Sequence, residues 1–535
     1  MLLLMPFRKS QKRLWRSLGA MSNRLSGLFF VAVSPALAMA EPVFKPVQVA
    51  EHIYQGGWEH YVGGGLASFD CDGDAFPELY AAGGSNPAKL FRNLSQRNDA
   101  VRFEEATPDT LALTSVTGAY PLDIDSDGNI DLAVLRAGRN LLLKGDGACG
   151  FTPFDTLALD PHEKWTTAFS ATWEAGQSLP TLAIGNYVDR TDPAGPFEAC
   201  DTNELYRPQG EVYGAAFPLD PGFCALSMLF TDWGRNGRAD LRVSNDRHYY
   251  VRDGEEQLWA LEPEPRLYTR QDGWQRFSIW GMGIASRDIS GDGLPDVFLT
   301  SMADQKFQFL TNREIPAYEN APFDLGVTAH RPYTGDDGRP STGWHVSFGD
   351  VQNDGLDDIF ISKGNVEQMP GSAMLDPNNL LVQTTAGKFV EKGDRAGLAT
   401  LHRSRGAVLA DFNRDGLLDV AVVNRRAPLE VYQNVTEVSG NWISVALHQL
   451  APNVQAVGAW IEVATADRTF TREVVVGGGH GGGTSGPQHF GLGAAESARI
   501  RVTWPDGGLS DWHSVDANQS LSLDRDGSDI VVTAY

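Results

Sequence analysis

Short runs of alternating apolar and polar residues recur along most of the chain, and tight glycine-containing turns separate them. Runs such as Asp131–Leu135, Asp296–Thr300 and Asp419–Val423 are rich in β-branched and aromatic residues, which favour strands. Most of the 57 glycines lie in the turns between such runs. The pattern predicts an all-β protein built of many short strands.

An acidic motif of the form D-x-D-x-D-G-x-x-D introduces many of these strands. Copies begin at the following positions: Asp70, Asp123, Asp232, Asp288, Asp350 and Asp411. A further unit at Trp173 keeps the strand and loses the acids, and the seven units start 50 to 62 residues apart. Such periods are typical of propellers or solenoids. We expect a seven-bladed β-propeller over 41–440, with a solenoid as the alternative.

The spacing of the acids indicates metal binding. Oxygen ligands at alternate positions of a tight loop converge on one hard cation, and Ca²⁺ accepts about six to eight of them with tolerant geometry, whereas Mg²⁺ is stricter. An EF-hand is excluded because its twelfth position needs a Glu, and the residue twelfth from Asp123 is Val134. The alternative is that Asp is frequent here because it suits solvated turns.

We therefore expect about five Ca²⁺ sites, with the loops at Asp232 and Trp173 empty. The predicted ligands are Asp70, Asp72, Asp74 and Glu78; Asp123, Asp125, Asp127, Asn129 and Asp131; Asp288, Ser290, Asp292 and Asp296; Asp350, Gln352, Asp354 and Asp358; Asp411, Asn413, Asp415 and Asp419. Asn129 would ligate through its carbonyl. The loops at Asp70 and Asp123 carry an acid at the third position, where the others have Ser, Gln or Asn, so we expect these two to be the strongest sites.

The first forty residues have the features of a secretory signal. Six basic residues and no acid occur in the first 24 positions, an apolar stretch (25–37) follows, and AMA (38–40) fits a cleavage site. A membrane anchor is the alternative, but the stretch is shorter than the roughly 20 residues of a span and contains a proline. We expect a signal peptide over 1–40, starting at Met1 or Met21, and a secreted, periplasmic or cell-surface protein without a later membrane span.

The mature chain is strongly acidic. It carries 38 basic and 68 acidic residues, a formal charge of −30, which excludes the basic surface of a nucleic-acid-binding protein. Four cysteines in an exported protein favour disulfides. Cys200 with Cys224 would close an irregular loop, and Cys71 with Cys149 then follows by elimination. A four-cysteine metal site is the alternative, but no C-x-x-C spacing supports it.

A new alternating pattern begins after the last repeat and predicts a separate β-domain over 441–535, with a hairpin at 458–479. The sequence G-x-G-x-x-G occurs at Gly477, Gly479 and Gly482, but a proline and more glycines follow instead of the helix that a dinucleotide site needs. We therefore expect no nucleotide cofactor. The flanking His480 and His489 are interpreted as loop and core histidines rather than as a metal or catalytic pair.

The repeat units resemble FG-GAP/VCBS repeats, as in the integrin α-subunit propeller. The tail segments GAWIEV, REVVVGGG, HFGLG and IRVTWPDG resemble the ASPIC/UnbV domain. Together they resemble the cartilage acidic protein family and its bacterial relatives, over roughly 50–520. The resemblance implies a secreted calcium-binding propeller that acts in matrix or cell-surface contacts without established catalysis.

We favour a monomeric, non-enzymatic module that binds an extracellular or periplasmic protein or glycan, with calcium making the blade loops rigid. Candidate contact segments are 185–210, 245–250 and 328–345, and no catalytic residue is expected. The first alternative is a propeller enzyme, of polysaccharide lyase or hydrolase type, with a site in the central channel. Its best acid–base candidates are His330 and His345, which we expect in one long loop. The second alternative is a periplasmic assembly scaffold.

Overall fold

The computed structural model describes residues 41–192, 199–246, 254–335, 337–437 and 440–535. They belong to a compact unit, Met39–Tyr535. The expected signal peptide lies outside the described residues. The described part contains many strands, one short helix, α1 (Gly393–Ala396), and a few 3-10 turns. The 3-10 turns are η1 (Trp58–His60), η2 (Asp155–Leu157), η3 (Arg270–Asp272) and η4 (Phe323–Leu325). The all-β expectation is confirmed.

Six of the seven sequence units form an antiparallel meander of four strands, and the seventh supplies three strands of such a sheet. Unit 1 consists of β2 (Leu66–Phe69), β3 (Glu78–Ala81), β4 (Lys89–Asn93) and β5 (Phe103–Glu105), and unit 2 of β6 (Val116–Leu122), β7 (Asp131–Arg139), β8 (Leu141–Gly145) and β9 (Phe151–Pro153). Unit 3 consists of β10 (Glu163–Thr172), β11 (Thr181–Asn186), β12 (Asn203–Tyr206) and β15 (Phe217–Leu219). Unit 4 consists of β16 (Ala225–Thr231), β17 (Asp240–Asn245), β18 (Gln257–Ala260) and β19 (Arg266–Leu267). A small hairpin of β13 (Pro208–Gln209) and β14 (Val212–Tyr213) is inserted into unit 3. Strands β7 and β10 also pair, which joins units 2 and 3 into one larger sheet.

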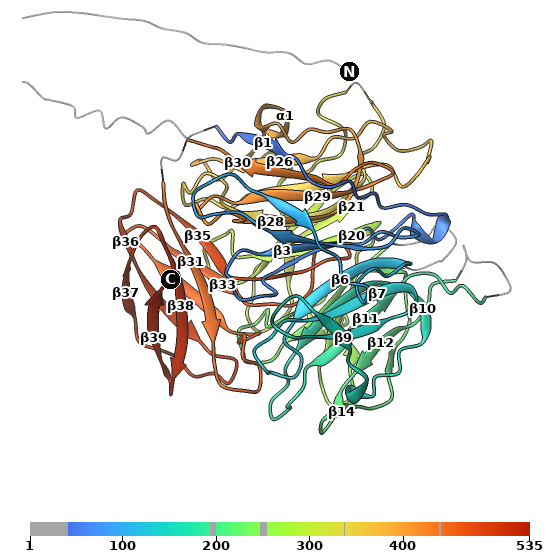
Figure 1. The fold of residues 1–535 in the computed structure, drawn as a ribbon, viewed down its shortest axis with the longest axis horizontal. Coiled ribbons are helices and arrows are strands. Elements are labelled where there is room, and N and C mark those ends of the chain that lie inside the picture. The colour runs from blue at the N-terminus through green and yellow to red at the C-terminus, as the bar shows by residue number, and fades with distance from the viewer. Residues whose placement is uncertain (1–40, 193–198, 247–253, 336, 438–439) are drawn as a thin grey trace, which may run out of the picture. The chain divides into compact units, whose positions relative to one another are not determined.

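Units 5 to 7 follow the same plan. Unit 5 consists of β20 (Gly281–Arg287), β21 (Asp296–Ser301), β22 (Lys306–Leu310) and β23 (Tyr318–Asn320). Unit 6 consists of β24 (Gly343–Gly349), β25 (Asp358–Lys363), β26 (Asn379–Gln383) and β27 (Phe389–Glu391). Unit 7 consists of β28 (Arg403–Ala410), β29 (Asp419–Arg425), β30 (Glu430–Asn434) and β1 (Phe44–Val47). The fourth strand of unit 7 thus comes from the start of the described chain, and Figure 1 shows β1 beside β30. In every unit the acidic loop, or its Trp173 counterpart, joins the first strand to the second.

The first strands of successive units pack against each other. Contacts join β2 to β6, β6 to β10, and so on through β16, β20, β24 and β28, and β28 in turn contacts β2. Strands β6 and β16 are buried at every position, which explains why they are near-continuous apolar runs rather than alternating ones. The apolar core therefore lies between neighbouring units, for example where Phe169, Leu182 and Tyr120 of units 2 and 3 meet.

The last part of the chain forms two more four-stranded sheets with their own apolar core. Their strands are β31 (Asn441–His448), β35 (Gln488–Gly493), β38 (Gln519–Asp526) and β39 (Asp529–Ala534) in one sheet, and β32 (Trp460–Ala464), β33 (Thr469–Glu473), β36 (Ser497–Thr503) and β37 (His513–Asp516) in the other. The predicted hairpin is present as the pair β32 and β33.

The glycine-rich segment between β33 and β35 runs along the first strands of the repeat units. Gly478 N–H donates to Met228 O (2.6 Å), Gly479 N–H to Ile284 O (2.8 Å), and Ala119 N–H to Gly481 O (3.0 Å). Its end, β34 (Thr484–Ser485), pairs in parallel with β2. No helix follows the glycines, as expected. We call residues 476–485 the glycine segment.

Both predicted disulfides are present, Cys71–Cys149 and Cys200–Cys224. The first joins the acidic loop of unit 1 to the turn between β8 and β9 of unit 2. Within the described residues, no helix is long and apolar enough to cross a membrane.

Candidate functional site

The first acid of each acidic loop folds the turn around its own side chain. Asp123 accepts the backbone N–H groups of Asp127 (3.1 Å) and Gly128 (2.8 Å). Asp411 accepts the equivalent pair, from Asp415 (3.1 Å) and Gly416 (2.8 Å). Such bonds are normal for Asp in turns. Taken alone, they are also what solvated acidic turns would show.

The closing acid ties the loop to the third strand of its own sheet. Asp131 accepts the N–H of Ile124 through Oδ2 and the N–H of Gly145 through Oδ1, both at 2.9 Å. Asp419 makes the same two bonds, with Phe412 and Asn434. Glu78, Asp296 and Asp358 repeat the arrangement. The closing acids thus have a structural role, and each oxygen keeps a second lone pair for a cation.

The third and fifth positions differ, because some of their oxygens have no protein partner. Asp72 Oδ1, Asp125 Oδ1 and Asn413 Oδ1 at the third position, and Asp354 Oδ2 at the fifth, are buried without a hydrogen bond. A buried polar atom left without a partner costs about 1–3 kcal/mol. Four orphaned oxygens in four different repeat loops are not explained by turn formation. Beside the spacing of the acids along the sequence, these oxygens are a second observation that favours a bound cation.

In two of the loops the acids lie in clusters of a size that suits Ca²⁺. One oxygen from each of Asp123, Asp125 and Asp127 lies within 4.8 Å of the others, and the same is true of Asp70, Asp72 and Glu78. Two oxygens bound to one Ca²⁺ lie no more than about 5 Å apart, because each is about 2.3–2.6 Å from the ion. The acids of these two loops therefore fit the ion.

Burial and mutual repulsion make these carboxylates hard to ionise without a cation. Burial raises the pKa of Asp350 to about 8, with a contribution from the charge of Asp354, and raises the pKa of Asp411 to about 7. The pKa of Asp131 is raised to about 7 and that of Glu78 to about 8, again chiefly by burial. A divalent cation among them would remove this cost.

The two loops expected to be empty have protein partners for their polar groups. In the loop at Asp232, the closing Asp240 accepts hydrogen bonds from Trp233 Nε1 (2.9 Å) and the Tyr268 hydroxyl (2.7 Å), and pairs with Arg238. In the Trp173 loop, Arg207 Nε donates to Glu174 Oε1 at 2.7 Å. No orphaned carboxylate oxygen occurs in either loop among the described residues.

Basic side chains contact the two loops that carry a third-position acid. Lys144, on β8, pairs with Asp125 and lies 2.7 Å from Asp127 Oδ2. Arg92, on β4, pairs with Asp72. Sequence reasoning did not find these residues. The sequence does contain a signal for them, namely a basic residue on the third strand at the position opposite the closing acid.

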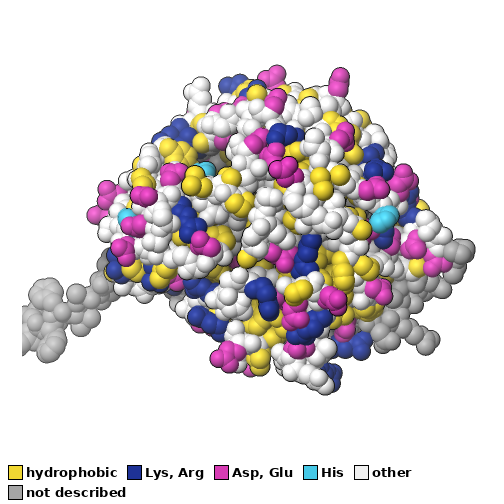
Figure 2. Space-filling model, turned by 90° about the horizontal axis from the view of Figure 1, so that it is seen from below, with side chains coloured by type: hydrophobic (Ala, Val, Ile, Leu, Met, Phe, Trp, Pro, Cys, Tyr) yellow, Lys and Arg dark blue, Asp and Glu magenta, His cyan; other side chains and the backbone are white. Residues whose placement is uncertain are grey.

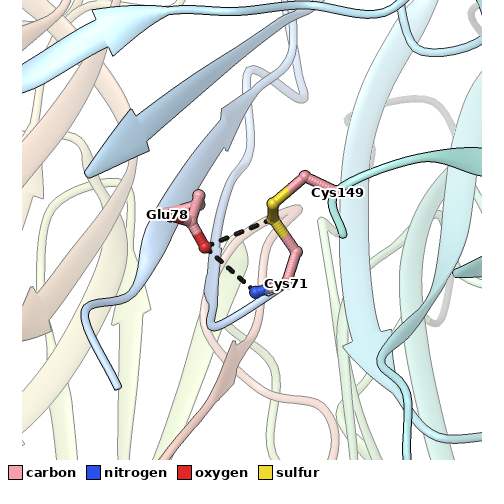
Figure 3. Close-up of side chains that lie close together, drawn as sticks. All are labelled: Cys71, Glu78 and Cys149. Carbon is pink, nitrogen blue, oxygen red and sulfur yellow. Dashed lines mark hydrogen bonds between the residues drawn. A yellow bond between two sulfur atoms is a disulfide. The ribbon is translucent and has the colours of Figure 1, made fainter. Parts of the chain in front are cut away.

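The loop at Asp70 is also fixed by a disulfide (Figure 3). Glu78 Oε2 accepts the N–H of Cys71 at 3.0 Å and lies 3.2 Å from Cys71 Sγ. Because a disulfide sulfur carries no hydrogen, the second approach is a close contact rather than a hydrogen bond. Cys71, Glu78 and Cys149 therefore form a structural cluster, and the bonded sulfurs are not thiolate metal ligands.

The four histidines singled out from the sequence lie in different environments. The expectation that His330 and His345 share a loop is wrong, because His345 lies on β24 and is buried. His345 Nδ1 accepts the N–H of His480 (3.1 Å) and its Nε2 contacts Ser347 Oγ (2.7 Å), and burial lowers its pKa to about 3. His330 is only half-buried and pairs with Asp304.

His480 and His489 are buried, as expected. His480 Nε2 accepts the N–H of Gly63 (3.2 Å), so its Nδ1 donates to Met282 O (3.0 Å). Burial lowers the pKa of His480 to about 4 and that of His489 to about 3. Both rings are thus neutral core groups at physiological pH.

The predicted contact segments are only partly described, because residues 193–198, 247–253 and 336 lie outside the described part. In 185–210, Tyr187 donates to Asp246 Oδ2 at 2.6 Å, and Cys200 is held by its disulfide. In 328–345, Tyr333 donates to Asn378 O at 2.7 Å. The described parts of these loops are therefore anchored to the neighbouring structure.

The C-terminal strands contact the acidic loops directly. His489 Nε2 bonds Asn353 Oδ1 (2.7 Å), and Arg472 pairs with Asp357 (2.9 Å). Asp232 N–H donates to Glu473 Oε1 (2.7 Å). A cavity of about 990 Å³ lies between loops and C-terminal strands. The predicted metal loops are thus part of a contact surface within the chain.

Comparison with known proteins assigns the family. Cartilage acidic protein 1 of Mus musculus is 32% identical over 479 residues, which cover 83% of this chain and 70% of that protein. The chain belongs to the cartilage acidic protein family. The Homo sapiens relative is 31% identical over 520 residues, covering 90% of this chain and 74% of that protein. The family model "ASPIC and UnbV" matches residues 449–529.

Among solved structures, a crystal structure of BBS1N in complex with ARL6DN aligns with a TM-score of 0.43 and 10% identity. The alignment covers 74% of this chain and 97% of that one. This likeness is too low to assign the fold.

Proposed function

We propose that this protein is an exported, calcium-binding β-propeller of seven blades that acts as a binding module for an extracellular or periplasmic protein or glycan. The blades would be the seven meanders. Their first strands contact each other in a cycle that returns from β28 to β2, and β1 completes the sheet of unit 7. Sharing one sheet between both ends of a repeat array would close a ring with few exposed edges.

The single observation that carries the calcium role is the set of orphaned oxygens. Asp72, Asp125, Asp354 and Asn413 each place a buried oxygen without a partner in a loop whose other acids are already hydrogen-bonded. When bound, Ca²⁺ would neutralise this charge. The chain's own residues hold the loop backbone in place through the first and closing acids, so the ion would stiffen loops that are already formed.

A binding role fits the family and the course of the glycine segment. The relatives are named for cartilage, a tissue rich in extracellular matrix. A channel enzyme is disfavoured because the glycine segment bonds to the first strands of units 1 to 5. On the face shown in Figure 2, acidic and basic side chains are interspersed, so a partner there would be recognised by local contacts rather than by a single-sign field.

Calcium binding is tested by calorimetric melting of the metal-free protein with Ca²⁺, with an equal concentration of Mg²⁺, and with EDTA. A site filled at 100 times its dissociation constant stabilises the fold by about 2.7 kcal/mol. We expect the melting temperature to rise by several degrees in Ca²⁺ and little in Mg²⁺. Identical melting in Ca²⁺ and EDTA would remove the calcium role.

The partner is sought with a glycan array and with a pull-down from the native host's envelope fraction, each run in Ca²⁺ and in EDTA. A specific glycan or protein retained only with Ca²⁺ is the expected result. Turnover of a polysaccharide by the purified protein, abolished in His330→Ala, would instead favour the enzyme alternative.

A further inference from the structure

One strand position distinguishes the repeat units, namely the residue on the third strand that faces the closing acid. In unit 1 the register pairs Leu79 with Phe91, so the preceding Glu78 faces Arg92. In unit 2 Leu132 pairs with Leu143, so Asp131 faces Lys144. Applied to all seven units, the register gives Arg92, Lys144, Arg207, Ala260, Phe309, Val382 and Gln433. We call this the facing position.

The facing position is basic in units 1 to 3, and each basic side chain pairs with an acid of its own loop. Arg92 pairs with Asp72, and Lys144 pairs with Asp125 and Asp127. Lys144 is partly exposed, with 36% of its side chain accessible. Its ammonium group therefore lies among carboxylates that Ca²⁺ would need, and it can leave towards solvent.

Units 5 to 7 have no such partner. Among the described residues, no ion pair joins a Lys or Arg to the nine acids at their ligand positions, which are Asp288, Asp292, Asp296, Asp350, Asp354, Asp358, Asp411, Asp415 and Asp419. The nearby Arg468 donates to Gly355 O, and Arg414 lies over the rings of Phe76 and Tyr535. Within the described residues, therefore, no basic side chain occupies the ligand positions of these loops.

The extra acid and the basic side chain occur together. Units 1 and 2 have Asp72 and Asp125 at the third position and a basic facing residue, whereas units 5 to 7 have Ser290, Gln352 and Asn413 and an uncharged one. When the facing residue is counted with the acids, the net charge is therefore the same in all five loops. The additional acid, Asp72 or Asp125, is therefore the partner of the basic facing residue and does not add net charge for a metal.

Unit 3 shows that the facing residue can hold a loop without a metal. Its loop has lost the metal acids, and Arg207 binds Glu174 through two bonds, Nε to Oε1 (2.7 Å) and Nη2 to Oε2 (2.9 Å). Such a two-bond pair is among the stronger charge-assisted contacts. A basic side chain at the facing position can thus contact the loop's acid where a bound ion would otherwise lie.

We propose that Arg92 and Lys144 are tethered cations that compete with Ca²⁺ for the loops at Asp70 and Asp123. The high-affinity calcium sites are then the loops at Asp288, Asp350 and Asp411. This inference rests on the proposed calcium function. It reverses the ranking that the sequence suggests, in which the loops with four acids are the strongest.

The test counts and ranks sites by titrating Ca²⁺ into the metal-free full chain, with calorimetry for affinity and native mass spectrometry for number. The wild type is expected to bind three ions tightly. Lys144→Met and Arg92→Met should each add one tight site, strengthened about tenfold, as expected for removal of one competing charge-assisted contact. Gln433→Lys, which places a tethered cation in unit 7, should remove one.

Lys306→Met is the matched control. Lys306 lies on the third strand of unit 5 but faces Leu299 rather than the closing acid, so this variant should leave the titration unchanged. If Lys144→Met folds poorly, Asp125→Asn/Lys144→Met replaces it, because the pair then resembles unit 7. Circular dichroism in EDTA checks folding of every variant.

The outcomes separate the two proposals. A wild type that binds five ions alike, with no change in Lys144→Met or in the double variant, overturns the tethered cations and leaves the calcium function standing. A wild type that binds no Ca²⁺ overturns the calcium function itself. Loss of a site in Gln433→Lys together with a gain in Lys144→Met supports both.

Discussion

Replacing Gly118 by Ala should separate the glycine segment from the strands it lies on. A Cβ at Gly118 would lie 1.8 Å from Gly481 O, where ordinary contact begins at 3.4 Å, and the neighbouring atoms are backbone. The glycine segment would have to move by more than 1 Å. That movement breaks the bonds from Ala119 N–H to Gly481 O (3.0 Å) and from Gly483 N–H to Ala119 O (3.2 Å).

The cost follows from those two bonds and the overpacking. Each buried group left without a partner costs about 1–3 kcal/mol, and forcing an extra carbon into a packed site costs about as much. We expect Gly118→Ala to lower the free energy of unfolding by about 4 kcal/mol. Urea denaturation followed by tryptophan fluorescence, in saturating Ca²⁺, measures this loss.

Gly486→Ala is the control, because a Cβ there meets nothing within 4 Å. It should change the free energy of unfolding by less than about 0.5 kcal/mol. Equal unfolding midpoints for Gly118→Ala and Gly486→Ala would refute the claim that the glycines are required by close backbone contact.

Two more predictions concern contacts outside the metal loops. Burial raises the pKa of Glu473 to about 8. The folded state therefore keeps a proton on Glu473 that the unfolded state loses near pH 4.5. The contribution of Glu473 to the free energy of unfolding falls as pH rises from about 4.5 to about 8. Glu473→Gln should flatten that fall in pH-dependent urea denaturation, and an unchanged pH profile would contradict it. Cys200→Ser/Cys224→Ser opens a loop with a sequence separation of 24 residues and should cost about 3 kcal/mol, and a cost near zero would show that this loop is fixed by other contacts.

The repeat units could be predicted from the sequence because their signal is local. Each acidic loop is followed at once by an apolar strand, as in Asp131–Arg139, and loop and strand recur seven times. The hairpin of β32 and β33 was accessible for the same reason. The disulfides were predicted differently, because Cys71 and Cys149 are 78 residues apart and were paired by elimination. The position of His345 was missed, because the segment 328–345 was interpreted as one loop although its last residues belong to β24.

Contacts between distant segments could not be read from the sequence. The glycine segment looked like a failed nucleotide motif, and its real constraint is the backbone of strands from Gly65 to Ile284, far from it in the sequence. The facing position was equally hidden, because Lys144 lies 19 residues after Asp125 and only the register of three strands brings them together. Under the proposed competition, the loops rank by whether a tethered cation occupies their ligand oxygens rather than by the number of acids.

The meander topology also limits where a partner would bind. In an antiparallel meander, the loops that follow the first and third strands lie at one end, and those that follow the second and fourth lie at the other. The acidic loops follow first strands, and the C-terminal strands contact them through His489, Arg472 and Glu473. Segments 185–210 and 328–345 follow a second and a fourth strand, so they belong to the opposite end. We therefore expect calcium to act at one end of the sheets, by stiffening the surface that carries the chain's own C-terminal sheets, and a partner to be bound at the other.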